Sequence, residues 1–292
     1  MAALAVSAGA LAYLLKDVSL RELALAVARQ PGRQVLVALA LTAVSFAGLA
    51  CHDLVGAHVA APGRVRPRTA LLAGAAGSAV ANTLGFHAVS GTAVRARIYL
   101  AAGIGAAEIA GIASLSWLSL GAGNAAMFAL AEITAAAMTA HPLRHLAIGS
   151  GLLVILLALL AWFGRAPRDL VVFSHSFPMP TAPIALAQVA IGAFESASAI
   201  GALYVLLPPD LAPPFSLFAA GCIAAVLLGV AAHTPGGIGV FEAGMTTLLG
   251  GRGRADLVAA LLLYRLLYNL LPFALALLAL AVHAGGTGRR RH

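Results

Sequence analysis

The chain has 292 residues, of which 61% are hydrophobic and only 10% are charged, and its mean hydropathy is +0.97. Soluble domains carry about 25% charged residues, so this composition excludes a purely soluble protein, and the high hydrophobicity excludes a disordered one. The formal net charge of +8 does not predict a nucleic-acid partner, because the basic residues lie mostly between apolar segments, where they set topology and meet anionic lipid headgroups. The apolar segments are unbroken rather than alternating, which excludes a β-barrel.

In chain order, a short apolar stretch over 2–15 precedes residues 17–33, where Leu20, Leu23 and Val27 share one helical face and charged residues take the other. We expect 17–33 to form an interfacial amphipathic helix. Crossing the hydrocarbon of a bilayer takes about 20 apolar residues. The segments that approach or exceed this length are 34–58, 69–91, 98–120, 144–163, 182–207, 214–233 and 255–283.

Two further apolar segments, 124–138 and 238–250, are too short to cross comfortably. Segments of that length are typically re-entrant or broken helices. The sequence therefore predicts an all-α fold, a polytopic helical membrane protein with about eight transmembrane helices plus one or two re-entrant or broken helices. We expect a single integral membrane domain over 1–292, with 234–250 as a broken or re-entrant segment.

The strongest clusters of basic residues are Arg64, Arg66 and Arg68 in one loop and Arg289–Arg291 in the tail. Because the Lys and Arg counts on the two sides of an eight-helix topology are nearly equal, the sequence leaves the orientation open. The histidines show no HExxH zinc pattern, and no GxSxG nucleophile motif occurs. We therefore expect no enzymatic activity, no cofactor and no bound metal.

Five acidic residues lie within or against apolar segments, and Arg265 is the basic residue well inside a predicted span. The five acids are Asp53, Glu108, Glu132, Glu195 and Glu242. A charge at the bilayer centre costs about 2.5–3.5 kcal/mol on insertion scales, so these side chains must face a polar interior, pair with one another or be protonated. For Asp53, Glu242 and Arg265 we favour a functional interpretation, whereas the roles of the other three stay open.

The first of three local patterns runs from Asn82 to Tyr99. Here a predicted span ends in glycine and small polar residues, and Arg95 and Arg97 come just before the next apolar segment. The planar guanidinium group donates two hydrogen bonds to one phosphate. We therefore predict that Asn82, Arg95 and Arg97 lie at headgroup level and bind a phospholipid phosphate.

The second pattern, from Thr234 to Glu242, contains a helix break. Its residues are Pro235, Gly236, Gly237 and Gly239. These residues end one helix and let another begin close by, with free N–H groups at its N-terminus. Glu242 falls in the first turns of the new helix, where it stabilises that end or faces a cationic group of a substrate. No Lys-Ser/Thr follows, which excludes a nucleotide P-loop.

The third pattern is a polar stripe formed by Tyr264, Arg265, Tyr268 and Asn269, because residues four apart are neighbours on a helix. Arg265 is predicted to be a counter-ion for one of the buried acids or for an anionic headgroup. Pro272 follows and is expected to kink the helix.

Together these patterns resemble the membrane-embedded flippase-type domain of the lysylphosphatidylglycerol synthases (multiple peptide resistance factor proteins) and its stand-alone relatives. The segments that carry the resemblance are Asn82–Tyr99, Thr234–Glu242 and Tyr264–Pro272, with Cys51–Leu54 and Leu203–Pro208. His52 stands where the family usually has a tyrosine. The resemblance covers nearly the whole chain in order.

The resemblance implies a helical domain that moves an aminoacylated or other phospholipid between leaflets, with Asp53, Arg95 or Arg97, Glu242 and Arg265 as important polar positions. Longer family members carry a soluble aminoacyltransferase domain that uses charged tRNA. This sequence shows no such domain, so we expect it to act alone, with a separate lipid-modifying synthase, or on another lipid.

We therefore expect a phospholipid translocase of the bacterial inner (plasma) membrane. The residues expected to contact lipid are Asp53, Asn82, Arg95, Arg97, Glu242, Tyr264, Arg265 and Tyr268. The sequence leaves open the lipid, the direction, the energy source and the oligomeric state. Two alternatives are a proton-coupled small-solute transporter and a non-transporting membrane partner of a lipid-modifying enzyme.

Overall fold

The structure is a computed structural model that describes residues 19–85, 87–164, 169–172, 175–178, 180–232 and 234–288. The apolar stretch 2–15 and the tail Arg289–Arg291 lie outside the described residues. The elements in chain order are α2 (Leu20–Ala28), α3 (Gly32–Ala60), α4 (Pro67–Leu84), α5 (His87–Ala101), α6 (Ala106–Ala135), α7 (Pro142–Gly164), β1 (Asp169–Val172), β2 (His175–Pro178), α8 (Ala182–Tyr204), α9 (Phe215–Ala231), α10 (Val240–Leu248), α11 (Ala255–Arg265) and α12 (Leu271–Gly288). Two 3₁₀ turns, Ala136–Met138 and Pro235–Gly237, and a π-helical segment, Leu266–Leu270, connect some of them.

The predicted fold class, an all-α polytopic membrane protein, is confirmed. Among the described residues, five helical stretches are long and apolar enough to cross a bilayer. They are Gly32–Ala60, Ala106–Met138, Pro142–Trp162, Ala182–Tyr204 and Ala255–Val282. The first, third, fourth and fifth match the predicted spans within a few residues, because hydropathy and length decide where such helices lie.

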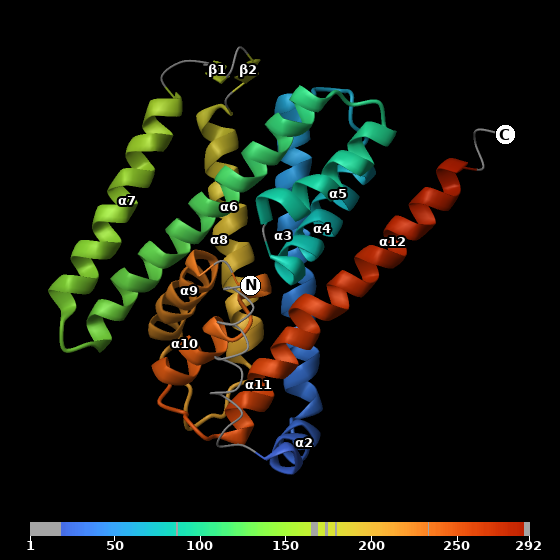
Figure 1. Ribbon diagram of the computed structural model, residues 1–292. Coiled ribbons are helices and arrows are strands. Elements are labelled where there is room, and N and C mark those ends of the chain that lie inside the picture. Colours follow the sequence, from blue (N-terminus) through green and yellow to red (C-terminus); the bar gives the residue numbers. More distant parts are fainter. Residues whose placement is uncertain are drawn as a thin grey trace.

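Two pairs of shorter helices complete the bundle (Figure 1). The pair α4 and α5 lies in the upper half of this view, and the pair α9 and α10 lies in the lower half. The predicted span 69–91 is wrong, because α4 ends at Leu84 and α5 begins at His87, so the turn falls inside that segment. Gly85 adopts φ 73° at this turn, a left-handed conformation that favours glycine.

The sequence predicted a separate partial helix at 124–138, and this prediction is wrong. The segment continues α6, and the 3₁₀ turn after Ala135 carries the same helical stretch to Met138. The predicted boundary near 98 is also displaced, because α5 ends at Ala101 and α6 begins at Ala106. Glu108 lies in the first turn of α6, where its carboxylate accepts the Gly105 N–H at 2.9 Å and favours helix initiation.

At the N-terminal end of the described chain, α2 occupies part of the predicted amphipathic segment 17–33. The Ser19 hydroxyl accepts the N–H of Glu22 at 3.2 Å, and the Glu22 carboxylate accepts the N–H of Ser19 at 3.0 Å. This reciprocal capping satisfies two of the N–H groups left open at a helix start. The helix packs on α11.

A short β-hairpin, which the sequence did not indicate, joins α7 to α8. Strands β1 and β2 pair antiparallel, with Asp169 opposite Pro178 and Val172 opposite His175. In Figure 1 the hairpin lies beyond the end of the helical bundle, above α7 and α8. It therefore does not alter the all-helical character of the membrane-spanning part.

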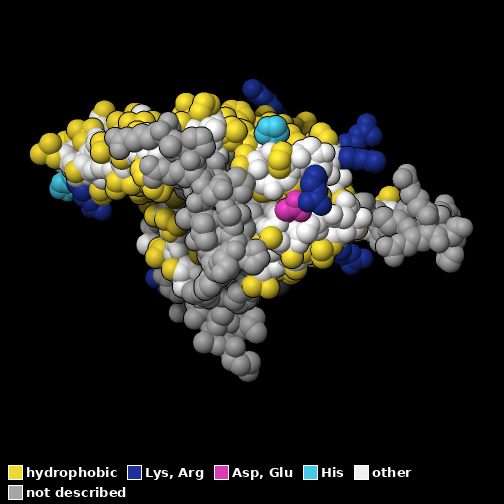
Figure 2. All heavy atoms as spheres, turned by 90° about the horizontal axis from the view of Figure 1, so that it is seen from above, with side chains coloured by type: hydrophobic (Ala, Val, Ile, Leu, Met, Phe, Trp, Pro, Cys, Tyr) yellow, Lys and Arg dark blue, Asp and Glu magenta, His cyan; other side chains and the backbone are white. Residues whose placement is uncertain are grey.

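Apolar side chains point outward over much of the molecule. Large exposed ones include Leu143 and Val154 on α7 and Leu278 and Val282 on α12. Figure 2 shows apolar side chains over much of the described surface at one end, with basic side chains at its margin. This distribution is typical of helices that face lipid and keep their charges near the headgroups.

Inside the bundle, α8 packs against both α3 and α6, and glycines permit the close approach. A Cβ added to Gly123 on α6 would lie 2.4 Å from the backbone of Gly192 on α8. In lipid no hydrophobic force drives helices together, because the acyl chains are as apolar as the helix surfaces. Helices associate there by close packing, which small residues permit. The α6–α8 contact therefore depends on glycine at these positions.

Replacing Gly123 with valine should lower the free energy of unfolding by about 1–3 kcal/mol, because the added atoms must push the two helices apart. Gly121→Val on the same helix is the matched control, since a Cβ there meets nothing within 4 Å. Thermal unfolding of both variants in detergent, followed by tryptophan fluorescence, measures the difference. Equal melting temperatures for the two variants would contradict this description of the contact.

Candidate functional site

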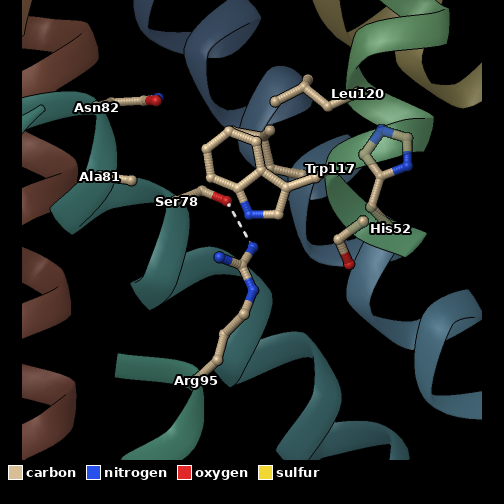
Figure 3. A pocket seen from close by; sticks show the side chains of 9 residues that line it. His52, Ser78, Ala81, Asn82, Arg95, Trp117 and Leu120 are labelled. Carbon is tan, nitrogen blue, oxygen red and sulfur yellow. Dashed lines mark hydrogen bonds between the residues drawn. The ribbon is translucent and has the colours of Figure 1, made fainter. Parts of the chain in front are cut away.

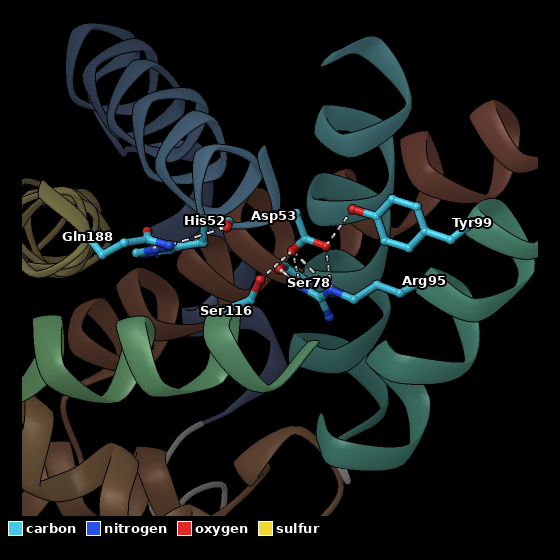
Figure 4. Close-up of polar contacts among 7 residues, drawn as sticks. All are labelled: His52, Asp53, Ser78, Arg95, Tyr99, Ser116 and Gln188. Carbon is cyan, nitrogen blue, oxygen red and sulfur yellow. Dashed lines mark hydrogen bonds and ion pairs between the residues drawn. The ribbon is translucent and has the colours of Figure 1, made fainter. Parts of the chain in front are cut away.

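The first buried ion pair joins Asp53 on α3 to Arg95 on α5 (Figure 4). Arg95 Nε donates to Asp53 Oδ1 at 2.9 Å and Nη2 donates to Oδ2 at 2.8 Å. The hydroxyls of Tyr99 and Ser116 also donate to the carboxylate, each at 3.2 Å, and Ser78 Oγ accepts from Arg95 Nη2 at 3.3 Å. Asp53 is 0% exposed and Arg95 5%. The two charges are therefore paired and hydrogen-bonded, as burial requires.

Glycines make room for this pair. A Cβ on Gly77 or on Gly91 would lie 3.0 Å from Arg95 Nη1, and a Cβ on Gly74 would lie 2.9 Å from the Cβ of Asp53. The small-residue pattern of α4 and α5 thus lets a guanidinium group lie between two closely packed helices.

Arg95 and Arg97, which the sequence predicted to act together on a phosphate, do not form a pair in the structure. Both residues lie within α5, and residues two apart on a helix do not share a face. Arg95 is buried against Asp53, whereas Arg97 is exposed. The structure thus brings Asp53 and Arg95 together and leaves Arg97 outside this site.

The second ion pair joins Glu242 on α10 to Arg265 at the end of α11. Arg265 Nε donates to Glu242 Oε1 at 2.6 Å, and Arg265 Nη1 donates to the carbonyl of Gly236. Glu242 Oε2 accepts the N–H of Gly239 at 2.7 Å. The Arg265 guanidinium also lies 5.3 Å from the ring centre of Phe241, within the range of a cation–π interaction.

The break between α9 and α10 depends on left-handed glycines. The φ angles of Gly236, Gly237 and Gly239 are 57°, 67° and 87°. A Cβ on Gly236 would lie 2.8 Å from the carbonyl oxygen of Thr83, at the C-terminal end of α4. The turn therefore needs glycine both for its backbone conformation and for this close approach.

Substituting Gly236 with alanine should lower the free energy of unfolding, because the new Cβ meets the Thr83 carbonyl in addition to the strain of a positive φ. Gly250→Ala is the matched control, since Gly250 has φ 61° but open space around it. A positive φ alone costs a non-glycine residue about 1–2 kcal/mol. Chemical or thermal unfolding should show a larger loss for Gly236→Ala, and equal losses would contradict the role of the close approach.

The end of α4 connects the two ion-pair regions. Asn269 Nδ2 donates to the carbonyl of Asn82 at 2.9 Å, and Thr83 Oγ1 donates to the carbonyl of Asn269 at 3.1 Å. Asn269 belongs to the π-helical segment, in which the Leu271 N–H donates to the carbonyl of Leu266. Where a kink was predicted, the helix carries this π-helical segment, which ends at Leu270, two residues before Pro272. Such segments are frequent at functional sites.

Tyr264 and Tyr268 were predicted to line the site with Arg265. In the structure Tyr264 stacks on Phe241, whose ring lies against Arg265, whereas Tyr268 turns toward α3 and α8. The two tyrosine rings stack at 5.1 Å between centres with an interplanar angle of 12°. The Tyr268 hydroxyl points to Ser45 and Glu195 on α3 and α8. Tyr268 therefore connects the π-helical segment to a third buried polar group, while Tyr264 lies beside the Glu242–Arg265 pair through Phe241.

A small cavity of about 30 Å³ adjoins the first ion pair (Figure 3). His52, Ser78, Asn82, Arg95 and Trp117 contribute to its lining. This volume suits one or two water molecules. The cavity thus lies against Arg95 and Ser78, although most of its lining is apolar.

His52 adds a polar atom to this region. Its Nδ1 lies 2.7 Å from Gln188 Oε1 on α8, while its Nε2 is buried with no hydrogen-bond partner. Sequence reasoning found His52 but missed Ser78, Ser116 and Gln188, because isolated small polar residues in apolar segments carry no distinctive spacing. Only the fold brings Ser78 and Ser116 to the ion pair and Gln188 to His52.

The remaining buried acids are paired in different ways. Glu132 Oε2 lies 2.7 Å from His145 Nδ1 on α7, and Glu108 pairs with Arg64 near the surface. Within the described residues, no group of three or more His, Cys, Asp or Glu side chains is arranged to hold a metal ion.

No protein-family model matches this chain. Over 135 residues, 45% of the chain, it is 33% identical to the inner membrane protein YbhN of Escherichia coli (strain K12), and the match covers 42% of that protein. Over 98 residues, 33% of the chain, it is 36% identical to the uncharacterized protein slr0712 of Synechocystis sp., and the match covers 30% of that protein. The matched region therefore spans less than half the length of either relative.

The helices and the buried charges define an integral, polytopic membrane protein. The similarity to YbhN further identifies it as a protein of the bacterial inner membrane.

Proposed function

We propose that the protein is a phospholipid translocase, which moves an aminoacylated or other phospholipid between leaflets through a polar pathway inside the bundle. The observation that carries this proposal is the pair of intramembrane ion pairs, Asp53–Arg95 and Glu242–Arg265. Intramembrane ionisable groups are expensive to keep and typically mark a substrate pathway.

Phospholipid headgroups have the chemistry to replace either partner of these ion pairs. The phosphate matches the fork of an arginine, which donates two parallel hydrogen bonds. The ammonium group of an aminoacylated lipid matches Asp53 or Glu242. A headgroup that substitutes for a carboxylate on arginine keeps the buried charge compensated, and this avoids the large penalty of an unpaired charge.

The local structure supports exchange at the second pair. Arg265 ends α11 and adjoins the π-helical segment, and Glu242 follows three left-handed glycines. Helix breaks at membrane depth commonly form substrate sites in transporters, because they direct free backbone groups into a cavity. Acyl chains would stay in the bilayer while the headgroup passes between the helices.

The resemblance to the flippase-type domain of lysylphosphatidylglycerol synthases supports a phospholipid substrate. It also suggests a separate lipid-modifying synthase as a partner that supplies this lipid. We propose transport rather than catalysis as the activity of the described domain, with no cofactor and no nucleic-acid partner.

Reconstitution into liposomes tests the proposal. Vesicles that contain the full chain and a fluorescent phospholipid are treated with a membrane-impermeant quencher, and the accessible fraction is followed with time. Proteoliposomes should lose nearly all fluorescence, whereas protein-free vesicles should keep the inner-leaflet half. Proton-coupled uptake of a small solute with no lipid movement would instead favour a solute transporter, and neither activity would favour a non-transporting partner.

A further inference from the structure

Glu195 on α8 is a buried acid that has no cationic partner among the described residues. It is 4% exposed, and no ion pair within the described part of the chain includes it. The other acids that the sequence placed in apolar segments each lie against an arginine or a histidine. Glu195 therefore differs from these four acids in the chemistry of its partners.

The partners of Glu195 are two hydroxyl groups from two other elements. Ser45 Oγ on α3 donates to Glu195 Oε1 at 2.7 Å, and the Tyr268 hydroxyl donates to the same oxygen at 3.2 Å. Ser45 Oγ and the Tyr268 hydroxyl lie 2.8 Å apart, and either can be the donor. Ser45 is 0% exposed and Tyr268 8%, so this cluster is shielded from solvent.

Because α3 and α8 pack closely, apolar atoms surround the cluster of Glu195, Ser45 and Tyr268. A Cβ on Gly48 of α3 would lie 2.9 Å from the Cβ of Glu195. Phe46 packs beside Tyr268, with ring centres 5.5 Å apart. An ionised carboxylate in such surroundings is strongly disfavoured, and a buried acid without a counter-charge takes up a proton instead.

Several titratable groups on the surrounding elements make contacts away from Glu195. On α3, Asp53 pairs with Arg95 and His52 contacts Gln188; on α6 and α7, Glu132 contacts His145; on α11, Asp256 and Arg265 pair with Arg254 and Glu242. Tyr264 stacks on Tyr268, and Cys222 on α9 lies in an apolar cluster. None of these described groups forms an ion pair with Glu195, which favours the neutral, protonated form of its carboxyl group.

Tyr268 links this acid to the second ion pair. It lies in the π-helical segment Leu266–Leu270, which begins directly after Arg265. The segment also contains Asn269, whose side chain is bonded to the end of α4. Loss of the proton would turn the Glu195 oxygens into acceptors only, would change the hydrogen bonds that Tyr268 makes, and would thereby act on the segment that positions Arg265.

We propose that Glu195 is a proton-binding site whose occupancy, transmitted through Tyr268, controls the Glu242–Arg265 pair and couples protons to transport. The inference that Glu195 binds a proton does not depend on which substrate is transported. The coupling rests on the proposed lipid translocation.

Infrared spectroscopy tests proton binding without any transport assay. The full chain in lipid vesicles is titrated from acidic to alkaline pH, and the carbonyl stretch of protonated carboxyl groups is compared among wild type, Glu195→Gln and the control Glu108→Gln. A band from a buried protonated carboxyl group should persist at neutral pH in wild type and in Glu108→Gln and be missing in Glu195→Gln. The same band in all three proteins would overturn the proposal.

The coupling is tested by lipid exchange measured across the same pH range. Wild type and Glu108→Gln should show pH-dependent exchange, whereas Glu195→Gln, which mimics the protonated acid, should exchange lipid with that pH dependence lost. Unchanged pH dependence in Glu195→Gln would overturn the coupling. If wild type moves no lipid at any pH, the proposed function fails, while the infrared result still decides whether Glu195 binds a proton.

Discussion

Lipid exchange by the Arg265→Gln variant is expected to fall to the protein-free background, and its folded state to lose stability. The substitution removes the group that would hold phosphate and leaves Glu242, which is 5% exposed, without its cation. Removing one partner of a buried ion pair typically costs about 3–5 kcal/mol. Fluorescent-lipid exchange and thermal unfolding in detergent measure the two effects separately.

A double variant separates loss of function from loss of folding. Glu242→Gln combined with Arg265→Gln removes both charges and leaves no unpaired one, so stability should recover toward wild type. Exchange should stay at background, because no guanidinium remains at this site. Wild-type exchange in the stable double variant would show that the Glu242–Arg265 pair is structural only.

Arg95→Ala is expected to abolish exchange, whereas Arg97→Ala, two residues along the same helix, is expected to leave exchange and stability near wild type. The difference arises because Arg95 makes two short hydrogen bonds to a fully buried carboxylate, while Arg97 is exposed. Arg95→Ala should destabilise the fold by about 3–5 kcal/mol, and Arg97→Ala by less than about 0.5 kcal/mol.

Arg95→Lys keeps the charge and so protects the fold, but a lysine cannot reproduce the planar two-bond contact. We expect this variant to fold and to exchange lipid more slowly than wild type, as measured by the initial rate of fluorescence loss. Equal sensitivity of exchange to changes at Arg95 and Arg97 would contradict the assignment of the site to the buried pair.

Hydropathy predicted the long helices well, because a bilayer requires about 20 apolar residues whatever they pack against. It failed for α4 and α5. Apolar residues run through 69–91 with little interruption, so the turn at Gly85 had no counterpart in the hydropathy pattern. It failed likewise at 124–138, where the glycines and polar residues of α6 resemble a loop yet lie inside one continuous helix.

The candidate site was predictable in part. A charged side chain is costly to place in a membrane, and this cost singled out Asp53, Glu242 and Arg265. The glycine-rich turn before Glu242 was visible in the sequence. The partnership of Asp53 with Arg95 was not predictable, because these residues lie on different helices and pairing depends on how the helices pack. Glu195 was noted as an intramembrane acid, but its two hydroxyl partners carry no sequence signal.

A structure of the full chain in nanodiscs of anionic phospholipid tests the central claim most directly. We expect a lipid headgroup between the helices, with its phosphate within hydrogen-bond distance of Arg265 or Arg95 and the corresponding carboxylate displaced from that arginine. Maps that resolve these side chains, show both ion pairs intact and contain no headgroup inside the bundle would contradict the account.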